Sequence, residues 1–258
     1  MTAATITYEQ PLNEQIRICL RLEHLFKQLR LHLENPSVPD SHQAMITLMK
    51  LLNVTNRPDL KSKLSQTLSQ QASLLAQLET APNVDTDKLQ DTLYQLDTLN
   101  DQLHHVTGKI GDPLRNNPFL NQIRMHLSHP GGPCSFSTPA YALWLQQPSE
   151  KRIDDLKKWT QGLTQLNSIE KIILKLTRES TNKQKLTASN GFYQQSLDAN
   201  LPCQMIRVTL PMALGAYPEI SVGKHRMAIR FLKLNFDNYE HAQQIRDDFE
   251  FTLNCCRI

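Results

Sequence analysis

The sequence has no segment that would export the chain or hold it in a membrane. Its first ten residues, MTAATITYEQ, have neither a cationic start nor an apolar stretch, and no apolar run approaches the roughly 20 residues of a membrane-spanning helix. The five cysteines are odd in number and irregularly spaced, which is typical of reduced thiols. These absences predict a cytoplasmic protein that does not insert into membranes.

The motifs of common enzyme classes are absent too. The chain has no phosphate-binding glycine loop, nucleophile elbow, HExxH or CxxC motif, and no pair of carboxylates stands out. His126, His129 and Cys134 could be three metal ligands, but a structural zinc site usually needs a fourth, so a cluster in a surface loop is favoured. A reactive pair is likewise the less favoured interpretation of the adjacent Cys255 and Cys256. The sequence therefore predicts a protein that is not an enzyme and has no metal or cofactor.

A large excess of one charge is also lacking. Lys and Arg outnumber Asp and Glu by 28 to 25, for a formal net charge of +3. A dedicated nucleic-acid-binding protein usually has a dominant basic patch. The composition therefore disfavours that class and directs attention to local groups of basic residues.

Residues 12–180 have the apolar spacing of helices. The first helix follows the capping residue Asn13, and a second is expected to begin at Asp40 or Ser41. Two segments rich in Leu and Gln come next and are joined by residues 80–85, which predicts an antiparallel hairpin. The hairpin is either part of an ordinary bundle or a projecting coiled-coil stem that meets a partner, and its short, irregular heptads do not favour the stem.

The apolar period changes from about 3.6 residues to about 2 in the last third of the chain. Three segments alternate as strands: 204–210, 225–234 and 249–253. Residues 213–219, which contain Gly and Pro, are expected to form a turn. The sequence therefore predicts an α+β fold, in which a mainly helical domain precedes an antiparallel β-sheet domain. The predicted domains are residues 12–182 and residues 183–258, with residues 1–11 expected to add an edge strand to the sheet.

One predicted strand contains basic residues and no acid. In the segment SVGKHRMAIRFLKLNF, residues 221–236, the basic residues are Lys224, His225, Arg226, Arg230 and Lys233. Strand alternation places Arg226, Ala228 and Arg230 on one face, and Lys224 extends the same side. The opposite face is expected to be buried and contains Met227, Ile229 and Phe231, with His225 and Lys233 pointing the same way.

Two guanidinium groups with a small alanine between them are suited to a carboxylate, because the planar arginine fork binds carboxylates bidentately. We interpret this face as a shallow basic pocket with an apolar floor, for a short peptide that carries an acidic residue next to aliphatic ones. The alternative is an ordinary surface on which the arginines pair with acids such as Asp247, Asp248 and Glu250. The strand pattern alone leaves both interpretations open.

Four segments resemble one known family. They are PLNEQIRICLRLE (11–23), HPGGPCSF (129–136), SNGFYQ (189–194) and GKHRMAIRF (223–231). Their order and spacing are similar to those of the ZapD family, bacterial cell division proteins associated with the ring of the tubulin-like GTPase FtsZ. The resemblance covers nearly the whole chain. It implies a cytoplasmic, non-enzymatic homodimer with a helical and a β domain, which binds the C-terminal tail of FtsZ and bundles its filaments at the mid-cell division ring.

The resemblance also implies binding residues. Those implied for the FtsZ tail are Arg226, Arg230, Lys224 and Arg57. Arg21 also matches the family and is a secondary candidate for contacting the partner. Arg115 and Arg124 are further secondary candidates because they lie near two positions where this chain departs from the family and could substitute there. At two positions where relatives carry a basic residue and a histidine, this chain has Pro118 and Ala142. Any FtsZ contact on that part of the helical domain is therefore left open.

A nucleic-acid-binding protein that uses the same basic strand is the alternative function. Such proteins stack bases on aromatic side chains, and no aromatic residue is interleaved between Arg226 and Arg230 on their face of the strand. Together with the low net charge, this argues against nucleic acid as the partner.

Overall fold

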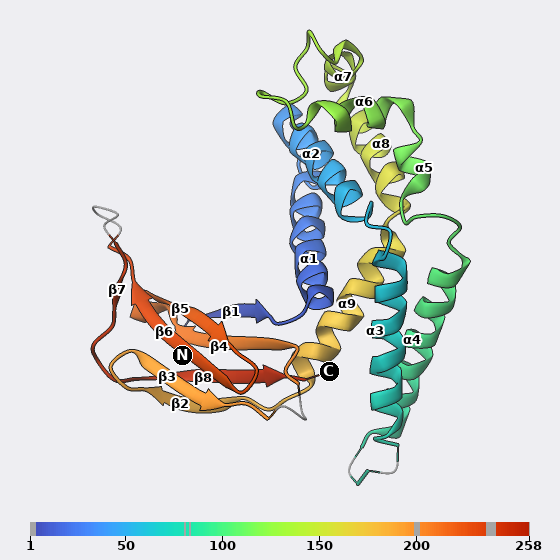
Figure 1. The fold of residues 1–258 in the computed structure, drawn as a ribbon. Coiled ribbons are helices and arrows are strands. Elements are labelled where there is room, and N and C mark those ends of the chain that lie inside the picture. The colour runs from blue at the N-terminus through green and yellow to red at the C-terminus, as the bar shows by residue number, and fades with distance from the viewer. Residues whose placement is uncertain (1–3, 80, 83, 199–201, 236–240, 258) are drawn as a thin grey trace. The chain divides into compact units, whose positions relative to one another are not determined.

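The computed structural model describes residues 4–79, 81–82, 84–198, 202–235 and 241–257 (Figure 1). The chain divides into two compact units. The helical unit is Ile18–Leu174, and the β unit combines Met1–Arg17 with Lys175–Ile258. A helical region is followed by antiparallel sheets, so the predicted α+β fold class is confirmed.

The helices are α1 (Glu14–Leu33), α2 (Val38–Val54), α3 (Leu60–Ala76), α4 (Thr86–His105), α5 (Asp112–Arg115), α6 (Pro118–His126), α7 (Pro139–Leu145), α8 (Ser149–Gln161) and α9 (Thr164–Glu179). The first turn of α1 and the last turn of α9 belong to the β unit. Within the described residues, no helix is both long enough and apolar enough to cross a membrane.

Helices α1 and α2 each begin at a capping side chain, which is Asn13 for α1 and Ser37 for α2. The predicted cap of α1 is confirmed, because Asn13 Oδ1 accepts a hydrogen bond from the Ile16 amide at 2.8 Å. The predicted start of α2 is wrong. The helix begins earlier, after Ser37, whose hydroxyl accepts from the Asp40 amide at 3.1 Å. Pro39 is tolerated there because the first turn of a helix has no use for its missing amide hydrogen.

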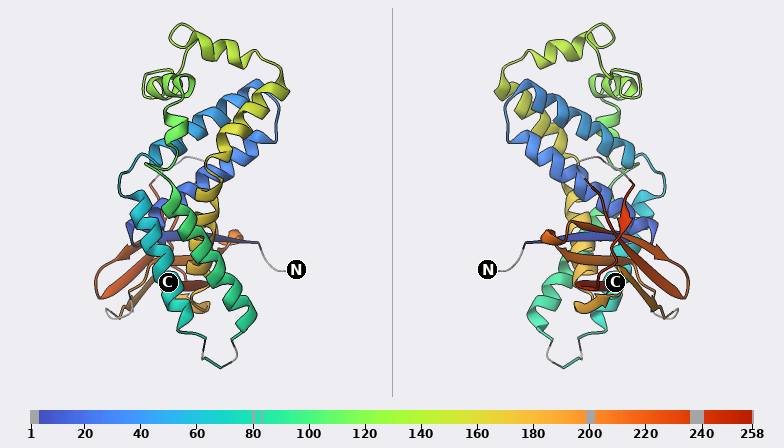
Figure 2. Two further views of the ribbon diagram at one scale, coloured as in Figure 1. Left: turned by 90° about the vertical axis from the view of Figure 1, so that its right-hand side faces the viewer. Right: turned by 90° about the vertical axis from the view of Figure 1, so that its left-hand side faces the viewer.

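Helices α3 and α4 form the predicted antiparallel hairpin and run side by side in both views (Figure 2). Lys61, in the first turn of α3, donates to the carbonyl of Val106, just after α4, at 2.7 Å. The buried Gln71 side chain donates to the Ile173 carbonyl of α9 at 3.2 Å. This bond ties α3 to another helix of the same unit, as in an ordinary bundle. Residues 80 and 83 of the predicted connection lie outside the described residues.

The strands are β1 (Thr5–Pro11), β2 (Gln184–Ala188), β3 (Phe192–Ser196), β4 (Met205–Pro211), β5 (Ala216–Val222), β6 (Arg226–Lys233), β7 (Gln243–Gln244) and β8 (Phe249–Cys256). They form two antiparallel sheets. The first has the order β1-β4-β8-β2, with β1 at an edge, and the second has the order β3-β6-β5, with β7 also paired to β6.

The turn expected over residues 213–219 is shorter than predicted. A single 3-10 turn, Met212–Leu214, ends at Gly215, which adopts a left-handed conformation with φ of 60°. Strand β5 then begins at Ala216 and includes Pro218. Proline is tolerated because β5 is an edge strand, where one side of the backbone has no partner within the sheet.

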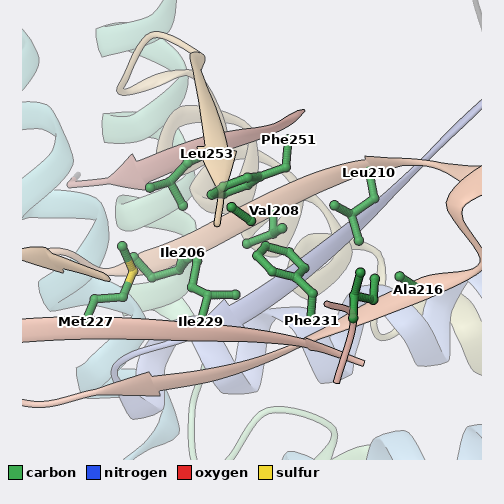
Figure 3. Packing of buried hydrophobic residues seen from close by; sticks show 11 residues of the cluster. Ile206, Val208, Leu210, Ala216, Met227, Ile229, Phe231, Phe251 and Leu253 are labelled. Carbon is green, nitrogen blue, oxygen red and sulfur yellow. The ribbon is translucent and has the colours of Figure 1, made fainter. Parts of the chain in front are cut away.

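The two sheets share one hydrophobic core. Met227, Ile229 and Phe231 point from β6 toward residues of β4 and β8 that include Ile206 and Phe251 (Figure 3). The Phe231 ring centroid lies 4.9 Å from that of Phe251. The predicted buried face of β6 is therefore confirmed, and the opposite face of the strand is left for solvent or a partner.

An ion-pair cluster links β1 to the rest of the β unit. The Glu9 carboxylate of β1 accepts from Arg178 at 2.7 Å and from Arg207 of β4 at 2.8 Å. The Glu9 side chain is only 16% exposed. Because both of its oxygens accept charged hydrogen bonds, Glu9 links the edge strand to its neighbour and to the end of α9.

Candidate functional site

Strand β6 lies at the centre of the second sheet and presents its arginines to solvent. Arg226 and Arg230 are exposed, and Ala228 between them is half-buried. The alanine side chain is much shorter than those of the two arginines that flank it. This arrangement agrees with the alternation predicted from the sequence.

The strands on either side add further side chains to the same face. Residues directly opposite each other in an antiparallel pair point to the same side of the sheet. Arg230 therefore lies between Phe192 of β3 and Glu219 of β5. We call this side the outer face; its residues are Phe192, Gln194, Ser196, Tyr217, Glu219, Ser221, Arg226, Ala228, Arg230 and Leu232.

The acid that pairs with the strand is Glu219. Arg230 donates to the Glu219 carboxylate at 2.9 Å, and the two side chains are 60% and 50% exposed. Of the acids expected from sequence, Asp248 instead accepts from the Asn190 amide at 2.8 Å. Glu219 faces Arg230 because strand register places them directly opposite each other. Such an exposed pair is weak, so Arg230 remains available to a stronger carboxylate partner.

Lys224 lies in the turn between β5 and β6. The turn is closed by the Gly223 amide, which donates to the Arg226 carbonyl at 2.9 Å. Lys224 lines a groove of about 330 Å³ together with Leu12, Leu197, Asp198, Pro202, Cys203, Val222 and Gly223. Val222 packs against the core of the sheets, so the groove opens beside the core and not in the centre of the outer face. Participation of Lys224 in the arginine surface stays a prediction.

The other predicted basic residues belong to the helical unit and not to the outer face. Arg21 and Arg57 are exposed, on α1 and before α3 respectively. Arg124 is half-buried and donates to Asn121 at 2.8 Å. Pro118 is exposed at the start of α6, and Ala142 is half-buried on α7.

Arg115 is held by its own unit. Its guanidinium donates to the Ile110 carbonyl at 2.6 Å, to Thr55 Oγ1 at 2.8 Å and to Asp112 at 2.8 Å. Its side chain is only 8% exposed. These bonds use most of its donors, so the geometry assigns Arg115 a structural role in joining α5 to the end of α2.

The histidines and cysteines singled out in the sequence are placed as follows. The rings of His126 and His129 meet edge-on, with centroids 5.0 Å apart, and the Cys134 thiol faces the Gly131 carbonyl. Among the described residues, no group of three or more His, Cys, Asp or Glu side chains is arranged to hold a metal. Cys255 interacts with Cys203, and this hydrogen bond lowers the pKa of Cys255.

The aromatic residues of the outer face could not be assigned to it from the sequence of β6. Phe192 and Tyr217 lie on β3 and β5, beside Arg230 and Leu232 respectively. Strand β6 has no aromatic residue between Arg226 and Arg230, but the neighbouring strands bring Phe192 and Tyr217 to the same face. The outer face thus combines two cations, one acid, hydroxyl and amide groups, and an apolar cluster.

Comparison with known proteins identifies relatives along the whole chain. A family profile described as "ZapD: Cell division protein" matches residues 20–230. The Cell division protein ZapD of Coxiella burnetii is 57% identical over 258 residues, which is 100% of both chains. Proteins of the same name from Ralstonia nicotianae and Dechloromonas aromatica are 37% identical over 254 residues and 34% identical over 253 residues, in each case 98% of this chain and 100% of the relative.

Proposed function

Because this chain belongs to the ZapD family of cell division proteins, we propose that it binds the C-terminal tail of FtsZ through the outer face of β6. In this proposal the protein is a non-enzymatic factor of the cytoplasm, recruited to the mid-cell division ring. The observation that carries the proposal is the pair of exposed arginines, Arg226 and Arg230, on either side of a small alanine on a rigid central strand. A tail carboxylate that approaches either guanidinium receives charge-assisted hydrogen bonds from planar donors.

Bundling follows if the protein is a homodimer. One exposed site of this kind binds weakly, because its charges are solvated and screened by salt. A dimer has two sites, and a filament displays one tail on every subunit. Once the first site is occupied, the second binds at a high effective concentration, so weak contacts become strong and two filaments are joined.

The test is co-sedimentation with FtsZ assembled in GTP. The expected result is that the protein pellets as bundles with intact FtsZ and stays in the supernatant with FtsZ that lacks its tail. Arg226→Glu combined with Arg230→Glu should abolish pelleting while the circular dichroism spectrum is retained. Lys183→Glu combined with Lys185→Glu, two exposed lysines of the β unit, is the control with the same change of charge. Equal bundling of tail-less FtsZ, or unchanged pelleting of the arginine variant, contradicts the proposal.

Binding of single-stranded nucleic acid is the second candidate function. The observation that favours it is the presence of Phe192 and Tyr217 on the same face as the arginines, where bases could stack. Against it, the net charge is only +3. Fluorescence anisotropy with labelled oligonucleotides of mixed sequence distinguishes the two functions, and we expect no binding at physiological salt.

A further inference from the structure

We propose that Phe192, Tyr217 and Leu232 form a subsite for one aliphatic or aromatic side chain of the bound tail, directly beside the carboxylate that Arg230 binds. This inference rests on the proposed function. It adds a second determinant of recognition, which is apolar, to the two arginines.

The three side chains are neighbours of Arg230 on the outer face. Phe192 is directly opposite Arg230 across the β3–β6 pair. Leu232 follows Arg230 by two residues on the same face of β6, and Tyr217 is directly opposite Leu232 on β5. Residues two apart along a strand are about 7 Å apart, and diagonal neighbours on adjacent strands are about as close. Leu232 therefore lies between Phe192 and Tyr217, and Arg230 lies beside this apolar group, which we call the cluster.

These side chains are not part of the core between the sheets. The residues that alternate with them, Tyr193 on β3 and Ile220 on β5, pack against the buried core. Phe192, Tyr217 and Leu232 point the opposite way and are each half-buried. They retain apolar surface, and a ligand that removes this surface from water gains affinity.

The chemistry around the cluster selects the occupant. Its cation, Arg230, demands an acidic group in the ligand, and the short distance to Leu232 demands an apolar residue close to that acid in sequence. An extended peptide fits both demands, because its side chains have the same period as the strand beneath it. A nucleic acid would use the aromatic rings but would gain nothing specific from Leu232.

The experiment is a double-mutant cycle between peptide and protein. The probe is a fluorescein-labelled peptide of the C-terminal tail of FtsZ from the same organism, and its anisotropy is measured with the full-length protein. Each aliphatic or aromatic residue of the peptide is replaced by serine in turn. The protein variants are Phe192→Thr, Tyr217→Thr and their combination, because threonine keeps the strand preference while it removes the ring. Tyr94→Thr, at an exposed aromatic of the helical unit, is the control.

The expected result is that serine at one peptide position, near an acidic residue, weakens binding about three- to tenfold. The same replacement should have little further effect on the Phe192→Thr, Tyr217→Thr double variant, because the partner surface is already lost. The Tyr94→Thr control should bind like wild type. The serine series uses the unaltered protein, so the test holds even where a protein variant folds poorly.

Three results overturn the inference. The first is that every serine peptide binds like the parent. The second is that the aromatic variants bind the peptide like wild type while Arg226→Glu with Arg230→Glu binds it weakly, which refutes the apolar subsite and leaves the proposed function intact. The third is that the aromatic variants lose self-association in sedimentation equilibrium, or lose oligonucleotide binding, without a change in peptide affinity. A parent peptide that does not bind, or binds equally to the arginine variant, refutes the proposed function itself.

Discussion

Replacing Glu219 with glutamine should strengthen binding of the tail peptide. In the free protein, Glu219 occupies Arg230 at 2.9 Å. A tail carboxylate must displace Glu219 or share the guanidinium with it, and in either case two carboxylates come close together. Glutamine keeps the size and the hydrogen-bonding ends of the side chain but removes the charge that competes with the ligand.

The size of the effect follows from the exposure of the pair. Both side chains are at least half exposed, so breaking the ion pair costs about 0.2–1 kcal/mol. Repulsion between Glu219 and a tail carboxylate about 7 Å away adds about 0.6 kcal/mol in a water-like dielectric, before screening by salt. Before screening, the sum is about 0.8–1.6 kcal/mol, an increase in affinity of about four- to fifteenfold. At about 0.1 M salt, screening roughly halves the repulsion, so the expected increase is about two- to tenfold.

The assay is fluorescence anisotropy of the labelled tail peptide at fixed, moderate salt. Glu250→Gln is the matched control, because Glu250 is an exposed acid of the β unit that lies in the other sheet. The control changes the net charge equally and should leave the affinity within about a factor of two of wild type. Weaker binding by Glu219→Gln would refute the reasoning, since it would mean that Glu219 positions Arg230 or contacts a cation of the tail.

Three further predictions concern stability and ionic strength. Glu9→Gln removes the charge that binds two arginines and should destabilise the β unit by about 2–3 kcal/mol. The loss is measured as faster hydrogen exchange of the β1 and β4 amides, and unchanged protection of these amides contradicts the prediction. Hydrogen bonds from Ser37 and His32 lower the pKa of Asp40. The contribution of Asp40 to stability is therefore present above about pH 4. It is lost as the pH falls through the lowered pKa that Asp40 has in the folded protein. Asp40→Asn should be less stable than wild type near neutral pH, and the difference should vanish in acid when unfolding is followed by the fluorescence of the two tryptophans, both in the helical unit. Peptide affinity should fall between about 0.1 M and about 1 M salt, because the Debye length shrinks from about 10 Å to about 3 Å; affinity that is independent of salt would exclude the exposed arginines as the main contacts.

Local periodicity was sufficient to predict how β6 is oriented. A strand that alternates between apolar residues and arginines has one stable way to bury its apolar side, so the exposure of Arg226 and Arg230 follows from the segment alone. The cap at Asn13 was predictable for the same reason, because a capping bond spans only three residues.

The neighbours of β6 required long-range register, which a single sequence does not show. Glu219 is opposite Arg230 because of how β5 pairs with β6, and Phe192 is opposite it because of how β3 does. Gly215 and Pro218 indicated a turn over the whole of residues 213–219, but only the glycine marks one. An edge position makes proline compatible with a strand, and edge positions are a property of the assembled sheet.

The measurement that tests the central claim most directly is photo-crosslinking of the FtsZ tail peptide to the full-length protein. A peptide with a photoreactive phenylalanine analogue is irradiated with the protein, and mass spectrometry locates the attachment. The account predicts crosslinks on the outer-face segments of β3, β5 and β6, and their loss in the Arg226→Glu, Arg230→Glu variant. Crosslinks confined to the helical unit, or unchanged in that variant, would contradict it.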